Sequence, residues 1–150
     1  MAYWLMKSEP DELSIEALAR LGEARWDGVR NYQARNFLRE MSVGDAFFFY
    51  HSSCPHPGIA GIAKITAAAY PDPTALDPES PYHDAKATAE KNPWSAVDVA
   101  HVQTFKQVLG LGLLKQQTAL EDLPLVHKGT RLSVMPVSPE QWAAIMALAR

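Results

Sequence analysis

Four consecutive aromatic residues, Phe47-Phe48-Phe49-Tyr50, constrain the fold of this chain more than any other feature. The run is too short for a lone helix, and aromatic residues favour strands. Because neighbouring side chains of a strand point to opposite faces of its sheet, such a run needs cover on both faces. The sequence therefore predicts a central strand that is buried on both sides.

Further strands and helices follow in an order that does not alternate strictly. Apolar runs predict strands over residues 3–7, 59–67, 97–105 and 131–135. Ser14 and Gly22 suit the start and the end of one helix, and an apolar stripe predicts a second helix over residues 34–41. Capping boxes predict two more, a short one at residues 118–121 that Pro124 stops and another from residue 138. We predict one α+β domain spanning residues 1–150.

The composition narrows the possible functions. The formal net charge is −3, so a positive surface for nucleic acid would have to be local. The lone Cys54 excludes an internal disulfide and a multi-cysteine zinc site, and it suits a reducing compartment. Neither a signal peptide nor an apolar stretch long enough to span a membrane is visible. We therefore expect a cytoplasmic, monomeric protein without a membrane partner.

The segment from Tyr70 to Pro93 contains five prolines and has no apolar period. A loop of this length in a compact domain is usually either functional or disordered. Tyr70, Tyr82 and Trp94 lie along it or just after it, and their aromatic rings favour packing onto the body of the domain. We predict an ordered, functional loop. Its stretch from Tyr82 to Lys86, together with Trp94, is either a small satellite core or one wall of a stacking pocket.

Opposite charges separate into two stretches of the chain. Residues 20–39 hold five arginines and two acids, whereas residues 72–98 hold six acids and two lysines. The first stretch also contains Trp26, Asn31 and Tyr32 beside Arg30 and Arg35. Arginine binds phosphate through bidentate hydrogen bonds, and a neighbouring aromatic ring can stack a base. This stretch is a candidate nucleic-acid surface, although a solvated helix face has the same composition.

Polar residues follow two of the predicted strands. Lys7-Ser8-Glu9-Pro10 lies either at the mouth of a site or in a loop that leads into a helix. His51-Ser52-Ser53-Cys54-Pro55-His56 suggests a metal site or a Cys/His pair, but it lacks a second cysteine and a group that would activate the thiol. We expect hydrogen-bonding residues at a strand end, with no metal, no cofactor and no catalytic group.

Several stretches together resemble the EVE-domain family. They occur in order over nearly all of the chain, at residues 3–10, 26–36, 48–52, 57–62, 70–72 and 77–78, at Trp94 with 97–99, and at 131–134. EVE domains are similar to YTH domains and, more distantly, to SRA domains. The resemblance implies a PUA-like fold, which is a barrel-like, twisted mixed sheet flanked by helices. It also implies a pocket that reads a modified base in DNA or RNA.

The resemblance also implies particular site residues. Lys7-Ser8 matches the pocket-lining end of the first YTH strand, and Trp26 matches a YTH cage tryptophan. Tyr82 or Trp94 would supply the second aromatic wall. The full set of candidate base-binding residues is Lys7, Ser8, Glu9, Trp26, Val29, Arg30, Asn31, Tyr32, Arg35, Tyr50, His51, Ser52, Tyr82, Lys86 and Trp94.

Within this set, the chemistry suggests two kinds of contact. Ser8, Asn31 and His51 can donate or accept hydrogen bonds at the edge of a base. Arg30 and Arg35 would contact a flanking phosphate or line the mouth of the pocket. The predicted function is a non-enzymatic, nucleic-acid-binding module that recognises a methylated or hydroxymethylated base. The rival hypotheses are an enzyme acting on a nucleotide or small molecule in the same pocket, and a protein-interaction domain.

Overall fold

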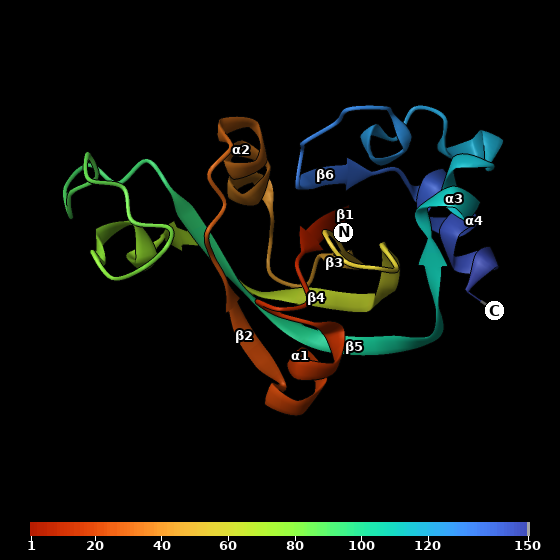
Figure 1. Ribbon diagram of the computed structural model, residues 1–150, viewed down its shortest axis with the longest axis horizontal. Helices are drawn as coiled ribbons and strands as arrows, with labels where there is room; N and C mark the ends of the chain where they lie inside the picture. Colours follow the sequence, from red (N-terminus) through yellow and green to blue (C-terminus); the bar gives the residue numbers. More distant parts are fainter. Residues whose placement is uncertain (150) are drawn as a thin grey trace.

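The computed structural model describes residues 1–149 and contains a single six-stranded sheet (Figure 1). The strand order is β2-β5-β4-β3-β1-β6, and only β1 and β3 run parallel. The strands are β1 (Tyr3–Ser8), β2 (Glu23–Trp26), β3 (Ala46–His51), β4 (Gly58–Pro71), β5 (Ser95–Gly110) and β6 (Val134–Val137). The helices are α1 (Ile15–Leu21), α2 (Tyr32–Glu40), α3 (Leu111–Lys115) and α4 (Pro139–Leu148).

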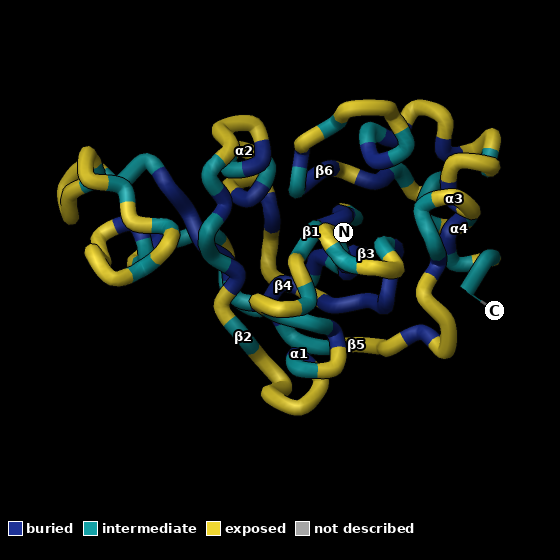
Figure 2. The backbone as a smooth tube through the Cα atoms, viewed as in Figure 1, coloured by how far each residue is buried: buried dark blue, intermediate teal, exposed yellow. Residues whose placement is uncertain are grey.

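The aromatic run forms the central strand β3, and it is buried on both faces as predicted (Figure 2). On one face, the ring of Phe48 stacks on that of Trp142 from α4 at a centroid distance of 3.9 Å. On the other face, Phe47 and Phe49 meet the ring of Trp26 edge-on at 5.6 and 5.3 Å. The two layers of side chains explain why four aromatic residues can follow one another without a polar break.

The helix signals of the sequence are largely confirmed. The Ser14 hydroxyl accepts from the Ala17 N–H at the start of α1, and Gly22 ends that helix with φ +80°. The capping box at Ser138 and Gln141 is complete, since each side chain bonds the backbone of the other residue. Asn31 caps α2, which begins two residues earlier than its apolar stripe.

Gly61 marks a close approach of two strands, as its position in a predicted strand suggested. A Cβ atom on this residue would lie 2.2 Å from the carbonyl oxygen of Gln103 on β5. The approaching group is therefore backbone rather than ligand. The register of β4 with β5 shifts at this point.

Three expectations need correction. The capping box at residues 118–121 does not form. Thr118–Leu120 and Pro124–Val126 are separate 3₁₀ turns without side-chain caps, because closely spaced Leu120, Leu123 and Leu125 are all drawn into the core. The last strand begins at Val134 instead of residue 131, since its pairing with β1 ends at Met6.

The third correction concerns the closure of the sheet. The twisted α+β architecture is confirmed, but the sheet is open rather than barrel-like. Its edge strands are β2 and β6, which do not pair with each other within residues 1–149. The sequence also gave no indication of β2, a strand of four residues with a single buried side chain, Trp26.

The proline-rich segment is ordered, and it begins later than expected. Strand β4 continues through Tyr70 to Pro71, and a 3₁₀ turn at Pro73–Leu76 follows. The chain then projects beyond the sheet before it returns as β5 (Figure 1). Several turns and short-range hydrogen bonds hold it, including one from the Asp84 N–H to the Ala75 carbonyl at 2.9 Å.

Candidate nucleic-acid interface

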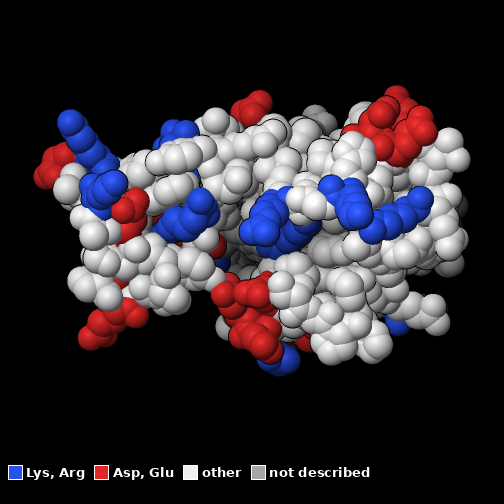
Figure 3. Space-filling view, turned by 45° about the horizontal axis from the view of Figure 1, so that its top comes forward, with Lys and Arg blue, Asp and Glu red and all other residues white. Residues whose placement is uncertain are grey.

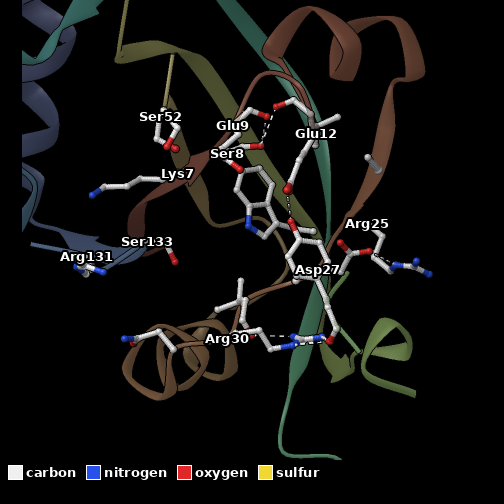
Figure 4. A pocket seen from close by; sticks show the side chains of 18 residues that line it. Lys7, Ser8, Glu9, Glu12, Arg25, Asp27, Arg30, Ser52, Arg131 and Ser133 are labelled. Atoms are coloured by element: carbon white, nitrogen blue, oxygen red, sulfur yellow. Dashed lines mark hydrogen bonds and ion pairs between the residues drawn. The ribbon is translucent and has the colours of Figure 1, made fainter. Parts of the chain in front are cut away.

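A cleft of about 650 Å³ opens where the parallel strands β1 and β3 end (Figure 4). Five separate stretches of the chain contribute to it: residues 7–13, residues 24–31, residues 52–53, Tyr82, and Arg131 with Ser133. This volume lies within the range of small-ligand pockets. The cleft therefore gathers side chains that are up to 126 positions apart in the sequence, from Lys7 to Ser133.

Hydrogen bonds fix the two strand ends at the cleft. The Ser52 N–H donates to the Ser8 carbonyl at 3.0 Å, and the Ser8 hydroxyl donates to the Leu13 carbonyl at 2.8 Å. His51 Nε2 accepts from the Ile15 N–H at 3.1 Å at the start of α1. Burial lowers the pKa of His51, which keeps the ring neutral and able to accept this bond. His51 is thus a buried structural acceptor and does not line the cleft.

Trp26 lines the cleft from the end of β2, but its side chain is mostly part of the core. The residue is 6% exposed, and its ring packs edge-on against Phe47 and Phe49. Together these contacts place the indole at the base of the cleft rather than at its rim.

Tyr82 reaches the cleft from the proline-rich segment and forms a wall. Its ring lies against Gly28, where a Cβ atom would come within 2.7 Å of the ring. Gly28 also has φ +77°, a conformation that side-chain-bearing residues rarely adopt. The Tyr82 hydroxyl donates to the Glu12 carboxylate on the opposite side, and burial together with this bond raises the pKa of Tyr82. Tyr82 therefore bridges two stretches that border the cleft.

Arg30 holds the segment that carries Tyr82. Its guanidinium makes five hydrogen bonds of 2.8 to 3.1 Å, which is the full donor capacity of an arginine. The acceptors are the carbonyl of Tyr82 (twice), the carbonyl of Val29, the hydroxyl of Thr74 and the carboxylate of Asp72. We call this set of contacts the Arg30 clamp.

Asp72 is the buried centre of the Arg30 clamp. Besides Arg30 at 3.0 Å, its carboxylate accepts from the N–H of Gly28 and from the N–H and hydroxyl of Thr74. Burial opposes ionisation of this group, but the hydrogen bonds from Thr74, Gly28 and Arg30 outweigh it, so the pKa of Asp72 is lowered. The carboxylate is therefore charged and saturated with donors.

Lys7 and Arg131 differ from Arg30, because neither makes an ion pair or a side-chain hydrogen bond within residues 1–149. Burial lowers the pKa of Lys7, whose Nζ lies 6.0 Å from the centroid of the Tyr50 ring. Figure 4 places both side chains on one side of the cleft and Glu12 and Asp27 on the other. Figure 3 shows a row of Lys and Arg side chains across one face of the molecule. We call Lys7 and Arg131 the free cation pair.

Nine of the fifteen predicted site residues lie together in the cleft. They are Lys7, Ser8, Glu9, Trp26, Val29, Arg30, Asn31, Ser52 and Tyr82. Several other lining residues were not among the predicted base-binding residues, for example Glu12, Gly28, Arg131 and Ser133. Arg131 and Ser133 were hidden because the apolar pattern around Leu132 and Val134 suggested that they belonged to a strand.

The remaining six predicted residues lie outside the cleft. Tyr32 and Trp94 stack on each other at 4.9 Å, and the Trp94 Nε1–H donates to Asp84 at 2.8 Å. Arg35 covers the Tyr32 ring and donates to the Pro93 carbonyl. Of the two aromatics considered for the second wall, Tyr82 is the one that lines the cleft. Tyr50 and His51 are buried, and Lys86 is exposed on the projecting segment.

Two further observations concern residues 1–149. In this part of the chain no three or more His, Cys, Asp or Glu side chains lie close enough together to hold a metal ion. None of its helices has the length and apolar character needed to cross a membrane.

Comparison with known proteins identifies the family. The EVE-domain model matches residues 2–148. Human thymocyte nuclear protein 1 is 39% identical over 171 residues, covering 98% of this chain and 73% of the relative. A Pseudomonas putida protein is 84% identical with a TM-score of 0.98, covering 99% of this chain and all of its own. Human THYN1 in complex with 5-methylcytosine-containing DNA is 38% identical with a TM-score of 0.95, covering 100% and 98% of the two chains. These neighbours confirm the PUA-like architecture, and the chain belongs to the EVE-domain family.

Proposed function

We propose that this chain is a single-domain, non-enzymatic module that binds DNA carrying a methylated cytosine and holds the modified base in the cleft. The observation that carries the proposal is the pairing of a free cation pair with an aromatic wall across one cleft. A complex of human THYN1 with 5-methylcytosine-containing DNA supports the choice of ligand.

The division of charge across the cleft suits a nucleotide in one orientation. Lys7 and Arg131 would attract phosphate on one side, since neither is neutralised by a protein acid. Glu9, Glu12 and Asp27 line the cleft as well, and carboxylates accept hydrogen bonds from the exocyclic amine of cytosine. The nucleotide would therefore enter with its phosphate toward the free cation pair and its amine toward the acids.

The energetics allow a flipped base. Extruding a base costs a few kcal/mol of unstacking. Stacking on one aromatic side chain such as Tyr82 returns about 1–3 kcal/mol, and burying a methyl group adds on the order of 0.8 kcal/mol. The second value limits discrimination between cytosine and 5-methylcytosine by the methyl group alone to a few-fold.

The chemistry of the cleft gives no support to catalysis. Of its three carboxylates, Glu12 and Asp27 are bonded to Tyr82 and Arg25, and Cys54 does not line the cleft. A binding role is therefore the simpler proposal. Turnover of a nucleotide by the purified protein would revive the enzyme hypothesis. The expectations of a cytoplasmic location and a monomeric state stay predictions.

The test is titration of the protein with short oligonucleotides that bear cytosine, 5-methylcytosine, 5-hydroxymethylcytosine, adenine or N6-methyladenine. DNA and RNA versions are compared at two salt concentrations. We expect the tightest binding to 5-methylcytosine DNA. Equal, weak and salt-sensitive binding to every oligonucleotide would contradict the proposal, whereas a preference for modified RNA would change its ligand.

A Tyr82→Leu variant tests whether the cleft is the binding site. Loss of one stacking ring should weaken binding roughly five- to 100-fold. Tyr70→Leu is the matched control, because the Tyr70 hydroxyl also donates to a carboxylate, that of Asp98, but the residue does not line the cleft. An equal loss of affinity in both variants would mean that the base does not bind in the cleft.

A further inference from the structure

The ring of Trp26 is mostly buried, yet the residue also lines the base of the cleft. Only 6% of the residue is exposed, and Phe47 and Phe49 both pack against its ring. A side chain that stacks a base has to offer the whole face of its ring to the ligand. So small an exposed area leaves room for contact at an atom or an edge, but not over a full face.

The indole Nε1–H of Trp26 has no protein acceptor within residues 1–149. Two other tryptophans in the chain do donate: Trp4 to Asp45 at 3.0 Å and Trp94 to Asp84 at 2.8 Å. Trp26 Nε1 is also not sealed inside the protein, since Thr66 Oγ1 is the sole buried, unpartnered polar side-chain atom of the described residues. The Nε1–H is therefore accessible from outside, and the residue that carries it lines the cleft.

An indole donor rarely stays unpaired when its ring is buried. In the free protein, water can take the bond, but a base that fills the cleft displaces this water. The ligand must then accept the hydrogen bond itself, or the complex loses one that the free protein had.

We propose that Trp26 reads the edge of the bound base through its Nε1–H and does not stack the base. The inference rests on the proposed function and names the chemistry of the ligand: a base that presents a carbonyl oxygen or an unprotonated ring nitrogen to the base of the cleft. Both acceptors are present on a cytosine. Tyr82, on the opposite stretch, supplies the stacking surface.

The decisive variant is Trp26→Phe, which keeps an aromatic ring in the core and removes the N–H. An interaction made through the donor predicts roughly tenfold weaker binding to 5-methylcytosine DNA. Trp142→Phe is the matched control, since Trp142 also has no acceptor within residues 1–149 and lies outside the cleft, stacked on Phe48. We expect it to bind as the wild type does.

Binding by Trp26→Phe within twofold of the wild type would overturn the proposal and favour an aromatic or purely structural role. A wild-type protein without preference for modified DNA would instead refute the proposed function, whatever the variant does. The two failures are therefore distinguishable.

A second readout does not depend on the folding of the variant. In an NMR titration of the wild type with 5-methylcytosine DNA, the Trp26 indole N–H signal should move downfield and exchange more slowly with water. The Trp142 signal should stay in place. An unchanged Trp26 signal at saturation would overturn the proposal.

Discussion

Two arginines line the same cleft, and they differ in whether their hydrogen-bond donors are occupied by the protein. All five N–H donors of Arg30 are occupied by protein acceptors, and the guanidinium pairs with the fully buried Asp72. Arg131 makes no side-chain hydrogen bond or ion pair within residues 1–149, and neither does Lys7. A cation whose donors are all occupied holds parts of the fold together. A cation whose donors have no protein acceptor is available to a ligand.

The same comparison explains what the two oppositely charged stretches of the sequence do in the fold. The arginine-rich stretch at residues 20–39 and the acidic stretch at residues 72–98 meet each other in the fold. Arg30 pairs with Asp72, and both Arg35 and Arg39 donate to the carbonyl of Pro93. Much of the local positive charge therefore fixes the projecting segment instead of forming a surface for phosphate.

The largest expected effect is a loss of stability when Arg30, the arginine with all its donors occupied, is replaced. Arg30→Met removes one member of a buried ion pair and strips Asp72 of its compensating charge. We expect a loss of about 3 kcal/mol in the free energy of unfolding, measured by urea denaturation. Residual bonds from Gly28 and Thr74 keep the loss from being larger.

Arg25→Met is the control for that variant. Arg25 also pairs with an aspartate, Asp27, at 2.8 Å, but its side chain is 45% exposed and that of Asp27 is 26% exposed. A solvent-screened pair of this kind contributes less than about 1 kcal/mol. Equal losses of stability in the two variants would show that the Arg30 clamp contributes no more to the fold than an exposed ion pair does.

The next effect concerns binding. Lys7→Gln and Arg131→Gln should each weaken binding to 5-methylcytosine DNA by roughly tenfold at low salt without lowering stability. Each should also reduce the slope of log affinity against log salt by roughly 1. Lys106→Gln, on β5 outside the cleft, is the control. A salt slope that is unchanged in both variants would mean that the free cation pair does not contact phosphate.

Much of the fold follows from the sequence, because its signals are local. A run such as Phe47–Tyr50 can occupy only a doubly buried strand, and the caps at Ser14 and Ser138 satisfy N–H groups within three residues. Signals failed where tertiary packing overrode them. The capping box at Thr118 gave way to two tight turns because the leucines around it are needed in the core.

The cleft could be predicted only in part. Lys7 and Ser8 are the last two residues of β1 and Ser52 follows β3, and polar residues at strand ends are visible in the sequence. Whether an arginine is free or saturated depends on partners that lie far away along the chain, such as Asp72 and Tyr82 for Arg30. Arg131 could not be assigned to the cleft, since its place depends on where β6 begins, and that strand starts only at Val134.

A pH titration sharpens the comparison within the free cation pair. Burial lowers the pKa of Lys7, and Lys7 binds phosphate only when protonated. Affinity for DNA should therefore begin to fall, as the pH rises, at a lower pH than an ordinary lysine would cause. Arg131→Gln should keep this decline because an arginine does not titrate in the range, and Lys7→Gln should lose it. A decline that persists in Lys7→Gln would assign it to another group.

The smallest expected effect is on stability, and its direction is the opposite of the usual one, because most substitutions lower the free energy of unfolding. Since the pKa of Lys7 is lower in the folded chain than in the unfolded one, the unfolded chain binds more protons between these two values. Stability therefore rises with pH across that window, and the charged lysine opposes folding at neutral pH. Lys7→Met should leave the free energy of unfolding unchanged or raise it by less than about 1 kcal/mol, because water still screens much of the side chain.

Arg131→Met should leave stability unchanged, since Arg131 is exposed. A loss of stability in Lys7→Met would mean that the packing of the lysine stem against Tyr50 outweighs the burial of its charge. In that case Lys7 would belong with Arg30, as a residue that holds the fold. A gain, combined with weaker DNA binding by Lys7→Gln, would show a charge kept at the cleft at the expense of stability, which is the pattern of a residue retained for its ligand.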